Sequence, residues 1–146
     1  MKQKSLIVIV FSMLTSLQVS AMNYGYVTLT ELQPTPQDAL WSRTKQFPPA
    51  YPVEMAMKSI VGCGVFKISI DKDGETESID LLASVPAAAA FKSAKKELKK
   101  WKWHNTTGKP DAAEQKIIRL DYCMGGSTEA EAAARCELQA KAECSE

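Results

Sequence analysis

The sequence predicts an α+β domain with a small antiparallel sheet. Two observations predict this class. Segments with the two-residue alternation of strands are interleaved with segments of helical apolar spacing, in the order helix, strand, strand, helix, strand, helix. An Asp-Gly pair at residues 73–74 separates the first two strands, where it predicts a tight hairpin turn. The chain beyond its N-terminal segment is long enough for one domain with its own core.

The N-terminal residues have the pattern of a secretory signal peptide. Two lysines within the first four residues precede an apolar run over 6–17, and residues 19–21 (VSA) suit signal peptidase. We therefore expect cleavage after Ala21 and an exported protein. The alternative is a segment retained as an inner-membrane anchor, although a spanning helix needs about 20 mainly apolar residues and this run is shorter.

Residues 22–46 predict an arm that wraps over the domain. Within it, residues 26–32 (YVTLTEL) have the composition of a short strand, and the two prolines that follow predict a turn or an extended linker. We expect Trp41 and Phe47 to anchor the arm by burying their rings.

Residues 53–60 then predict a two-turn helix that ends before Gly62. The strands on both sides of the hairpin turn alternate apolar and polar residues, and Pro86 ends the second strand. Residues 87–103 have the apolar spacing of one main helix. Its many lysines predict a solvated face, with a membrane-surface or partner-binding face as the alternative.

Residues 114–123 predict the third strand, and residues 127–146 predict a polar helix. On the strand, Ile118, Leu120 and Tyr122 share one face. The helix begins with a capping box formed by Thr128 and Glu131. Because its apolar residues are mostly alanines, this helix should dock weakly, and a disulfide would help to tether it.

The four cysteines and the composition limit the classes of function that the chain can have. Cys63, Cys123, Cys136 and Cys144 are an even number, which in an exported chain indicates disulfides. There is no C-x-x-C pair and only one histidine, so we expect no metal site and no cofactor. A Ser-His-Asp set and a Gly-rich phosphate loop are not apparent, which argues against an enzyme. A net charge of +1 gives no reason to expect nucleic acid.

Landmarks over about residues 47–123 resemble those of the TonB C-terminal domain family. In the family's order and spacing they are Tyr51-Pro52, Gly62, Asp73-Gly74, Pro86, Trp101 with Trp103, and Gly108-Lys109-Pro110. The resemblance implies a three-stranded sheet in the order 2-1-3, packed on one main helix, with a short N-terminal helix and an added C-terminal helix. It divides the chain into a signal peptide (1–21), an arm (22–46), a TonB-like domain (47–124) and a disulfide-tethered helical tail (125–146).

The resemblance also implies a periplasmic module that binds a protein or an extended peptide, such as a segment of an outer-membrane receptor. Strand 116–123 would be a sheet edge whose unpaired backbone groups accept an added strand. The implied partner-binding residues are Ile117, Ile118, Arg119, Leu120, Asp121 and Tyr122. Most would act through backbone groups, with Arg119 and Asp121 tuning specificity from an open face. The alternatives are an edge covered by the arm or by the last helix, and a homodimer formed through free edges.

The sequence departs from the family pattern in ways that concern energy transduction. The anchor looks cleavable, the long spacer of the family is absent, and the family's Gln before Tyr51-Pro52 is replaced within residues 47–50 (FPPA). A membrane-anchored energy transducer that supports outer-membrane receptor transport is therefore the alternative function, and a soluble binding module is the first.

In the sheet implied by the resemblance, the strand that starts at Cys63 begins beside the end of the strand at Cys123. Both side chains would point away from the core, so we expect a Cys63–Cys123 disulfide. Cys136 and Cys144 are too far apart to bond on a straight helix, where eight residues span about 12 Å. Either the tail bends between them, or Cys63 or Cys123 pairs with the tail.

Overall fold

The computed structural model describes residues 23–45, 48–109 and 112–145. The expected signal peptide lies outside these residues, and so does Phe47, one of the two anchors expected for the arm. The other anchor, Trp41, is buried. Within the described ranges, no helix is long and apolar enough to cross a membrane.

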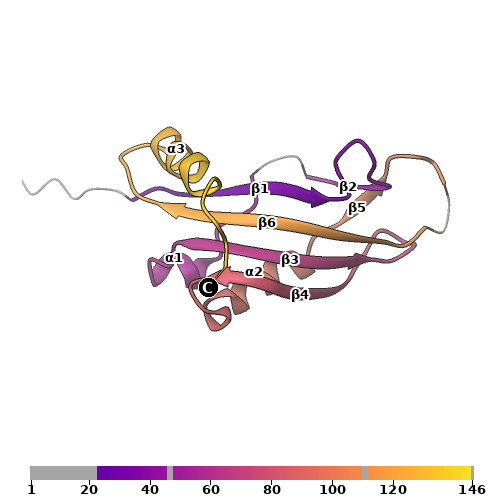
Figure 1. The fold of residues 1–146 in the computed structure, drawn as a ribbon, viewed down its shortest axis with the longest axis horizontal. Coiled ribbons are helices and arrows are strands. Elements are labelled where there is room, and N and C mark those ends of the chain that lie inside the picture. Colours follow the sequence, from indigo (N-terminus) through magenta and orange to yellow (C-terminus); the bar gives the residue numbers. More distant parts are fainter. Residues whose placement is uncertain (1–22, 46–47, 110–111, 146) are drawn as a thin grey trace, which may run out of the picture.

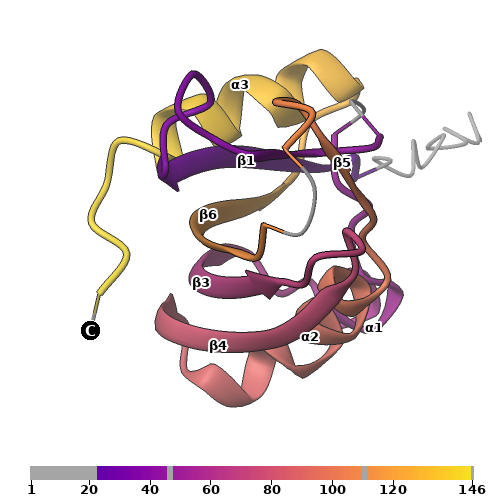
Figure 2. The same cartoon turned by 90° about the vertical axis from the view of Figure 1, so that its right-hand side faces the viewer.

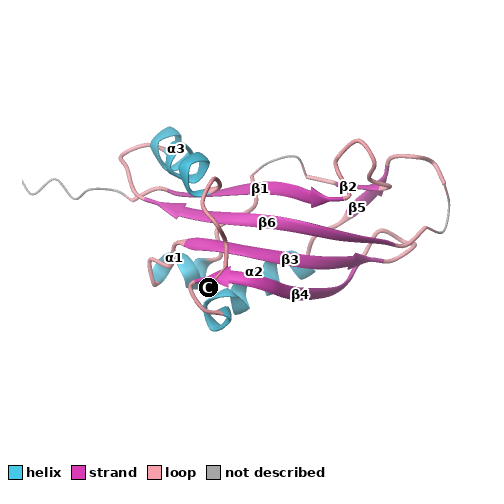
Figure 3. Cartoon of the chain, in the orientation of Figure 1, coloured by secondary structure: helices cyan, strands magenta, loops and turns pink. Residues whose placement is uncertain are grey.

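A four-stranded antiparallel sheet forms the centre of the domain (Figures 1 and 3). In order across the sheet, its strands are β1 (Gly25–Gln33), β6 (Glu114–Met124), β3 (Gly62–Ile70) and β4 (Thr76–Val85). The α+β class is confirmed, and β4-β3-β6 is the expected 2-1-3 arrangement. The prediction of three strands is wrong, because the arm contributes β1 as a fourth strand beside β6.

Helices lie on both faces of this sheet (Figure 2). One face carries α1 (Val53–Met57) and α2 (Lys92–Lys99), which is preceded by the 3-10 turn η1 (Ala88–Phe91). The other face carries α3 (Glu129–Gln139), which packs on β1 and β6. A separate two-stranded sheet pairs β2 (Trp41–Arg43) with β5 (Trp103–Asn105).

The main helix is shorter than the predicted span of 87–103. It ends at Lys99, and Trp103 belongs to β5. The Thr76 hydroxyl of β4 donates to the carbonyl of Trp101 (3.0 Å) and accepts a hydrogen bond from the Trp103 indole (2.9 Å). These contacts hold the chain extended after α2, so tertiary hydrogen bonds override the local helix propensity.

The core lies between the sheet and the helices α1 and α2. The alternation predicted for β3 and β6 is confirmed, since every second side chain of these strands is buried there. The fully buried apolar side chains include Val27, Met55, Phe66, Ile68, Ile70, Phe91, Leu98, Ile118, Leu120 and Tyr122. Tyr51 stacks edge-to-face on Tyr122, with ring centroids 5.6 Å apart, and burial raises the pKa of Tyr51 to about 12.

The predicted hairpin turn between β3 and β4 is confirmed. The Asp71 carboxylate accepts hydrogen bonds from the backbone N–H groups of Asp73 and Glu75, both at 2.9 Å. The bond from the Glu75 N–H is the main cause that lowers the pKa of Asp71. Gly74 closes the turn with a φ of 76°, a left-handed conformation that glycine adopts without steric cost.

Gly62 at the start of β3 gives a test of this packing. Its φ is 144°, and a Cβ there would lie 1.8 Å from the Val85 carbonyl oxygen. We expect Gly62→Ala to lower the free energy of unfolding by at least about 2 kcal/mol, because backbone strain and steric overlap add. In the control, Gly108→Ala, φ is 67° and nothing lies within 4 Å of the added Cβ, so we expect a loss of about 1 kcal/mol. Urea unfolding measures both losses, and equal losses would contradict the steric explanation.

Candidate functional site

All six predicted partner-binding residues lie in β6, so the structure brings them together on one strand. These residues are Ile117, Ile118, Arg119, Leu120, Asp121 and Tyr122. Their side chains alternate between the core face and the face that carries α3. The strand prediction for this segment is confirmed, because β6 spans Glu114–Met124.

β6 is not an edge of the sheet. On one side β1 pairs with it antiparallel, from Gly25 opposite Met124 to Gln33 opposite Ile117. On its other side β6 pairs with β3. The expectation of a free edge at 116–123 is therefore wrong. The alternative expectation, in which the arm covers this strand, is confirmed.

The main-chain groups of β6 alternate between its two neighbours. Just beyond the ladder, the Tyr24 carbonyl accepts a hydrogen bond from the Gly125 N–H (3.0 Å). Hydrogen-bonded pairs alternate with non-bonded pairs in an antiparallel ladder, so every second residue of β6 directs its N–H and C=O toward β1. These residues are Arg119, Asp121 and Cys123. The residues between them direct their main-chain groups toward β3, and they are Ile118, Leu120 and Tyr122.

β1 is held largely through its main chain. Of its nine residues only Val27 is buried, at 1% exposed. Leu29 packs on the edge of the core, and most other side chains of the strand are partly or fully exposed. The pairing of β1 with β6 therefore requires few particular side chains in β1.

One ion pair joins the C-terminal half of β1 to β6. The Lys116 ammonium lies 2.9 Å from the Glu31 carboxylate and 3.6 Å from that of Glu114. The Lys116 side chain is only 1% exposed. We did not predict a role for Lys116 or Glu31 from the sequence. The available signal was that Lys116 is in phase with Ile118, and so with the buried face of the strand.

Arg119 and Asp121 lie beneath α3 and the chain that follows it. Two guanidinium nitrogens of Arg119 donate to the two carboxylate oxygens of Asp121, at 2.9 and 3.0 Å, and Asp121 is fully buried. Arg119 also donates to the carbonyls of Gln139 (3.0 Å) and Ala142 (2.7 Å). This face was expected to be open, and the structure covers it. The two residues clamp the C-terminal tail to the sheet.

Both disulfides attach the tail to the sheet, and the predicted Cys63–Cys123 pair is wrong. Cys63 bonds Cys144 and Cys123 bonds Cys136, with Cα atoms 5.8 and 5.4 Å apart. The reason lies in the strand register, since Asp121 is the residue opposite Cys63. Cys123 is two residues farther along, and such diagonal neighbours are about 7–8 Å apart, beyond disulfide range.

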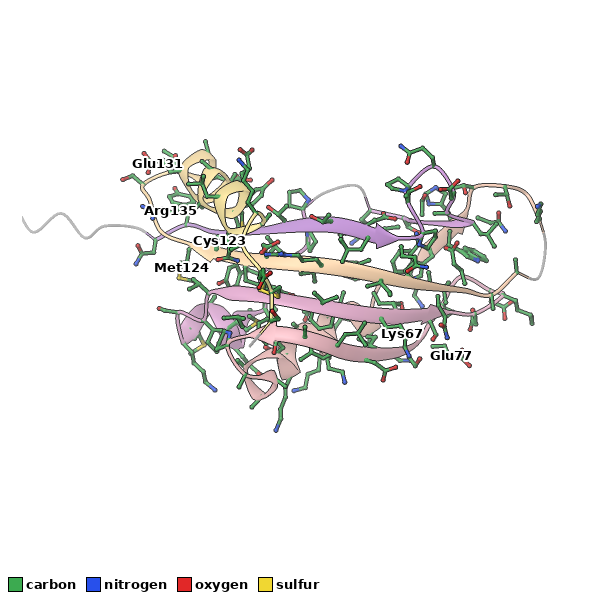
Figure 4. The ribbon with its side chains drawn as sticks, viewed as in Figure 1. Lys67, Glu77, Cys123, Met124, Glu131 and Arg135 are labelled. Atoms are coloured by element: carbon green, nitrogen blue, oxygen red, sulfur yellow. A yellow bond between two sulfur atoms is a disulfide. The ribbon has the colours of Figure 1, made fainter. Side chains whose placement is uncertain are left out.

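The tail crosses the sheet because the chain is no longer helical after α3 ends at Gln139. Figure 1 shows it passing from α3 across β6 and β3 toward β4, and Figure 4 shows Cys123 at the end of β6 that α3 covers. The predicted helix start is confirmed, since the Thr128 side chain accepts a hydrogen bond from the Glu131 N–H. The helix ends at Gln139, earlier than predicted, which lets Cys144 reach β3.

Residues 48–123 match the family of the Gram-negative bacterial TonB protein C-terminal. The chain belongs to this family. Its members are periplasmic, non-enzymatic domains that interact with outer-membrane receptors in transport. The matched range includes β3, β4 and all of β6 except Met124, whereas β1 and α3 lie outside it.

Among solved structures, the chain is similar to the solution NMR structure of the Pseudomonas aeruginosa TonB CTD. The two are 21% identical, the match covers 62% of this chain and 87% of that chain, and the TM-score is 0.39. No curated protein matches the sequence. In the described ranges, no group of three or more His, Cys, Asp or Glu side chains is placed to hold a metal ion.

The Arg119–Asp121 clamp can be tested by substitution. We expect Asp121→Asn to lower the free energy of unfolding by about 3 kcal/mol, because it leaves the guanidinium of Arg119 without its carboxylate. Adding Arg119→Gln removes the unpaired charge, so the double variant should lose less than the sum of the two single losses. Chemical unfolding of the four chains measures this coupling, and strictly additive losses would contradict the clamp.

Proposed function

We propose that this chain is an exported periplasmic binding module that takes up an extended segment of a protein partner as a strand beside β6. The partner would pair with the main chain of residues 117–122, chiefly with the groups that now face β1. Family membership supports a segment of an outer-membrane receptor as the partner class. In this proposal residues 1–21 direct export, and the module itself begins in the arm.

The observation that carries the proposal is β1. A segment from outside the family-matched region fills the place beside β6, and only Val27 of that segment is buried. A place filled mainly through main-chain hydrogen bonds accepts other extended segments of suitable pattern. β1 therefore stands where the partner strand would stand, and it has to leave when the partner binds.

The energetics of such an exchange are nearly balanced. Removal of β1 breaks its ladder with β6, exposes Val27 at a cost of about 1.5–3 kcal/mol and separates Glu31 from Lys116. An incoming strand restores terms of the same kind, so the difference depends on side chains and on the entropy of binding. Exchange would start at the C-terminal end of β1, where a bulge between Glu31 and Gln33 already interrupts the register. α3 covers the other end, with Cys136 Sγ 3.5 Å from the Tyr26 carbonyl.

The proposal gives each part of the chain a role. Within the arm (22–46), β1 is the exchangeable part and Trp41 stays anchored in the core. Residues 47–124 are the binding domain, and residues 125–146 are the disulfide-tethered clamp. A second copy of the chain carries the same strand, so reciprocal exchange of β1 between two copies would give a homodimer with the same β1–β6 pairing. We propose that dimer as a state that competes with partner binding at high protein concentration.

Thr30→Pro tests the exchange. By the ladder alternation, the Thr30 N–H points to β6, and proline removes this donor. We expect the variant to hold β1 less tightly and to capture several-fold more partner from detergent-solubilised outer membranes than the wild-type chain does. Thr30→Ala is the matched control, because it removes the same exposed side chain and keeps the N–H.

Circular dichroism and light scattering accompany the capture experiment, so that loss of fold and dimer formation are seen directly. The proposal fails if the Thr30→Pro chain is folded and monomeric yet captures no more partner than the Thr30→Ala chain.

A further inference from the structure

The buried ammonium of Lys116 is placed at the boundary between β1 and β6. Its side chain is 1% exposed, and the ammonium lies 5.8 Å from the centroid of the Trp103 ring. A lysine buried to this extent requires charged partners, because an unpaired buried charge is costly. Here those partners are the carboxylates of Glu31 and Glu114.

The two carboxylates are not equivalent. Glu114 belongs to β6 itself and accepts hydrogen bonds from the backbone N–H groups of Leu40 (2.8 Å) and Trp41 (3.2 Å). Its position is therefore fixed by the segment that leads into β2. Glu31 is the nearer carboxylate and belongs to β1. When β1 leaves, Lys116 loses the nearer partner and keeps the more distant one.

We propose that Lys116 selects the incoming strand by its charge, so that the preferred partner is an extended segment with a carboxylate side chain at the place of Glu31. This inference rests on the proposed exchange of β1 and names the chemistry of the segment that replaces it. The segment runs antiparallel to β6, as β1 does.

The other positions of the segment follow from the side chains that β1 presents to the core. Side chains two residues apart share a face of a strand, so Val27, Leu29 and Glu31 point the same way. Val27 belongs to the core cluster and Leu29 packs against it. At Gly25, an added Cβ would lie 2.9 Å from the ring of Tyr51, so this position favours glycine. The preferred pattern is Gly-x-apolar-x-apolar-x-acidic.

Synthetic peptides test this pattern on the full chain. The probe is a fluorescein-labelled copy of residues 25–33 (GYVTLTELQ), and it is titrated with the Thr30→Pro chain, in which β1 is weakened. In these peptide experiments the folded chain that binds the peptide is called the receptor, as distinct from the outer-membrane receptor. We expect the Glu31→Gln peptide to bind about tenfold more weakly by fluorescence anisotropy, since hydrogen bonds between charged groups contribute more than neutral ones. A Glu31→Lys peptide should show no binding, and a scrambled peptide gives the background.

A change in the receptor identifies Lys116 as the cause. In the Lys116→Met, Thr30→Pro chain the preference for the Glu peptide should be lost or reversed, because the cation is gone and the Glu114 carboxylate remains. If either receptor fails to fold, the Glu31→Gln chain with an otherwise unchanged sequence is the second receptor, since it weakens β1 through the same ion pair. The Glu, Gln and Lys peptides then test the charge preference without a change at Lys116.

The outcomes separate this inference from the proposed function. Binding of the Glu and Gln peptides within twofold of each other to a folded receptor would overturn the charge preference and leave strand exchange standing. Binding of none of the peptides above the scrambled background would overturn the exchange as well. A tenfold preference that persists in the Lys116→Met receptor would assign the selection to a residue other than Lys116.

Discussion

The pairing of β6 on both of its sides is the interaction on which the rest of the structure depends. Through β3 it joins the hairpin with β4, and through that hairpin the helices α1 and α2 that close the core. Through β1 it brings the arm into the same sheet. The two sides differ in kind, because β3 buries alternate residues along its whole length, whereas β1 buries only Val27. The position beside β6 is therefore filled by a strand that buries a single side chain.

The covalent links follow the same division. All four cysteines are in disulfides, and these bonds join the C-terminal tail to β3 and to β6. None of them lies in β1. This strand is held by hydrogen bonds to β6, by Val27 and Leu29 on the core side, by α3 on the other face and by the pair between Glu31 and Lys116. The buried Arg119–Asp121 pair also attaches the tail, because Arg119 donates to the carbonyls of Gln139, the last residue of α3, and of Ala142. The chain thus keeps the binding strand and the C-terminal clamp together, whereas no disulfide holds β1.

The sequence predicts the elements better than it predicts their neighbours. The segment 26–32 is readable as a strand from its composition, but alternation reports which face a side chain takes and not which strand lies alongside. The same limit explains the cysteines, because a shift of two residues in register places Asp121 opposite Cys63. The burial of Lys116 follows from its phase on β6. Its partner Glu31, which is 85 residues away, depends on a tertiary pairing that no local pattern contains.

Native-state hydrogen exchange on the full chain, followed by NMR at low denaturant concentrations, tests most directly whether β1 can leave β6 without global unfolding. Release of β1 alone should expose the amides that face it, with a low opening free energy and a weak dependence on denaturant. These are the amides of Arg119, Asp121 and Cys123. The amides that face β3 should exchange only with global unfolding, and they are those of Ile118, Leu120 and Tyr122. One shared opening free energy and one shared denaturant dependence for all six amides would contradict a separately exchangeable β1.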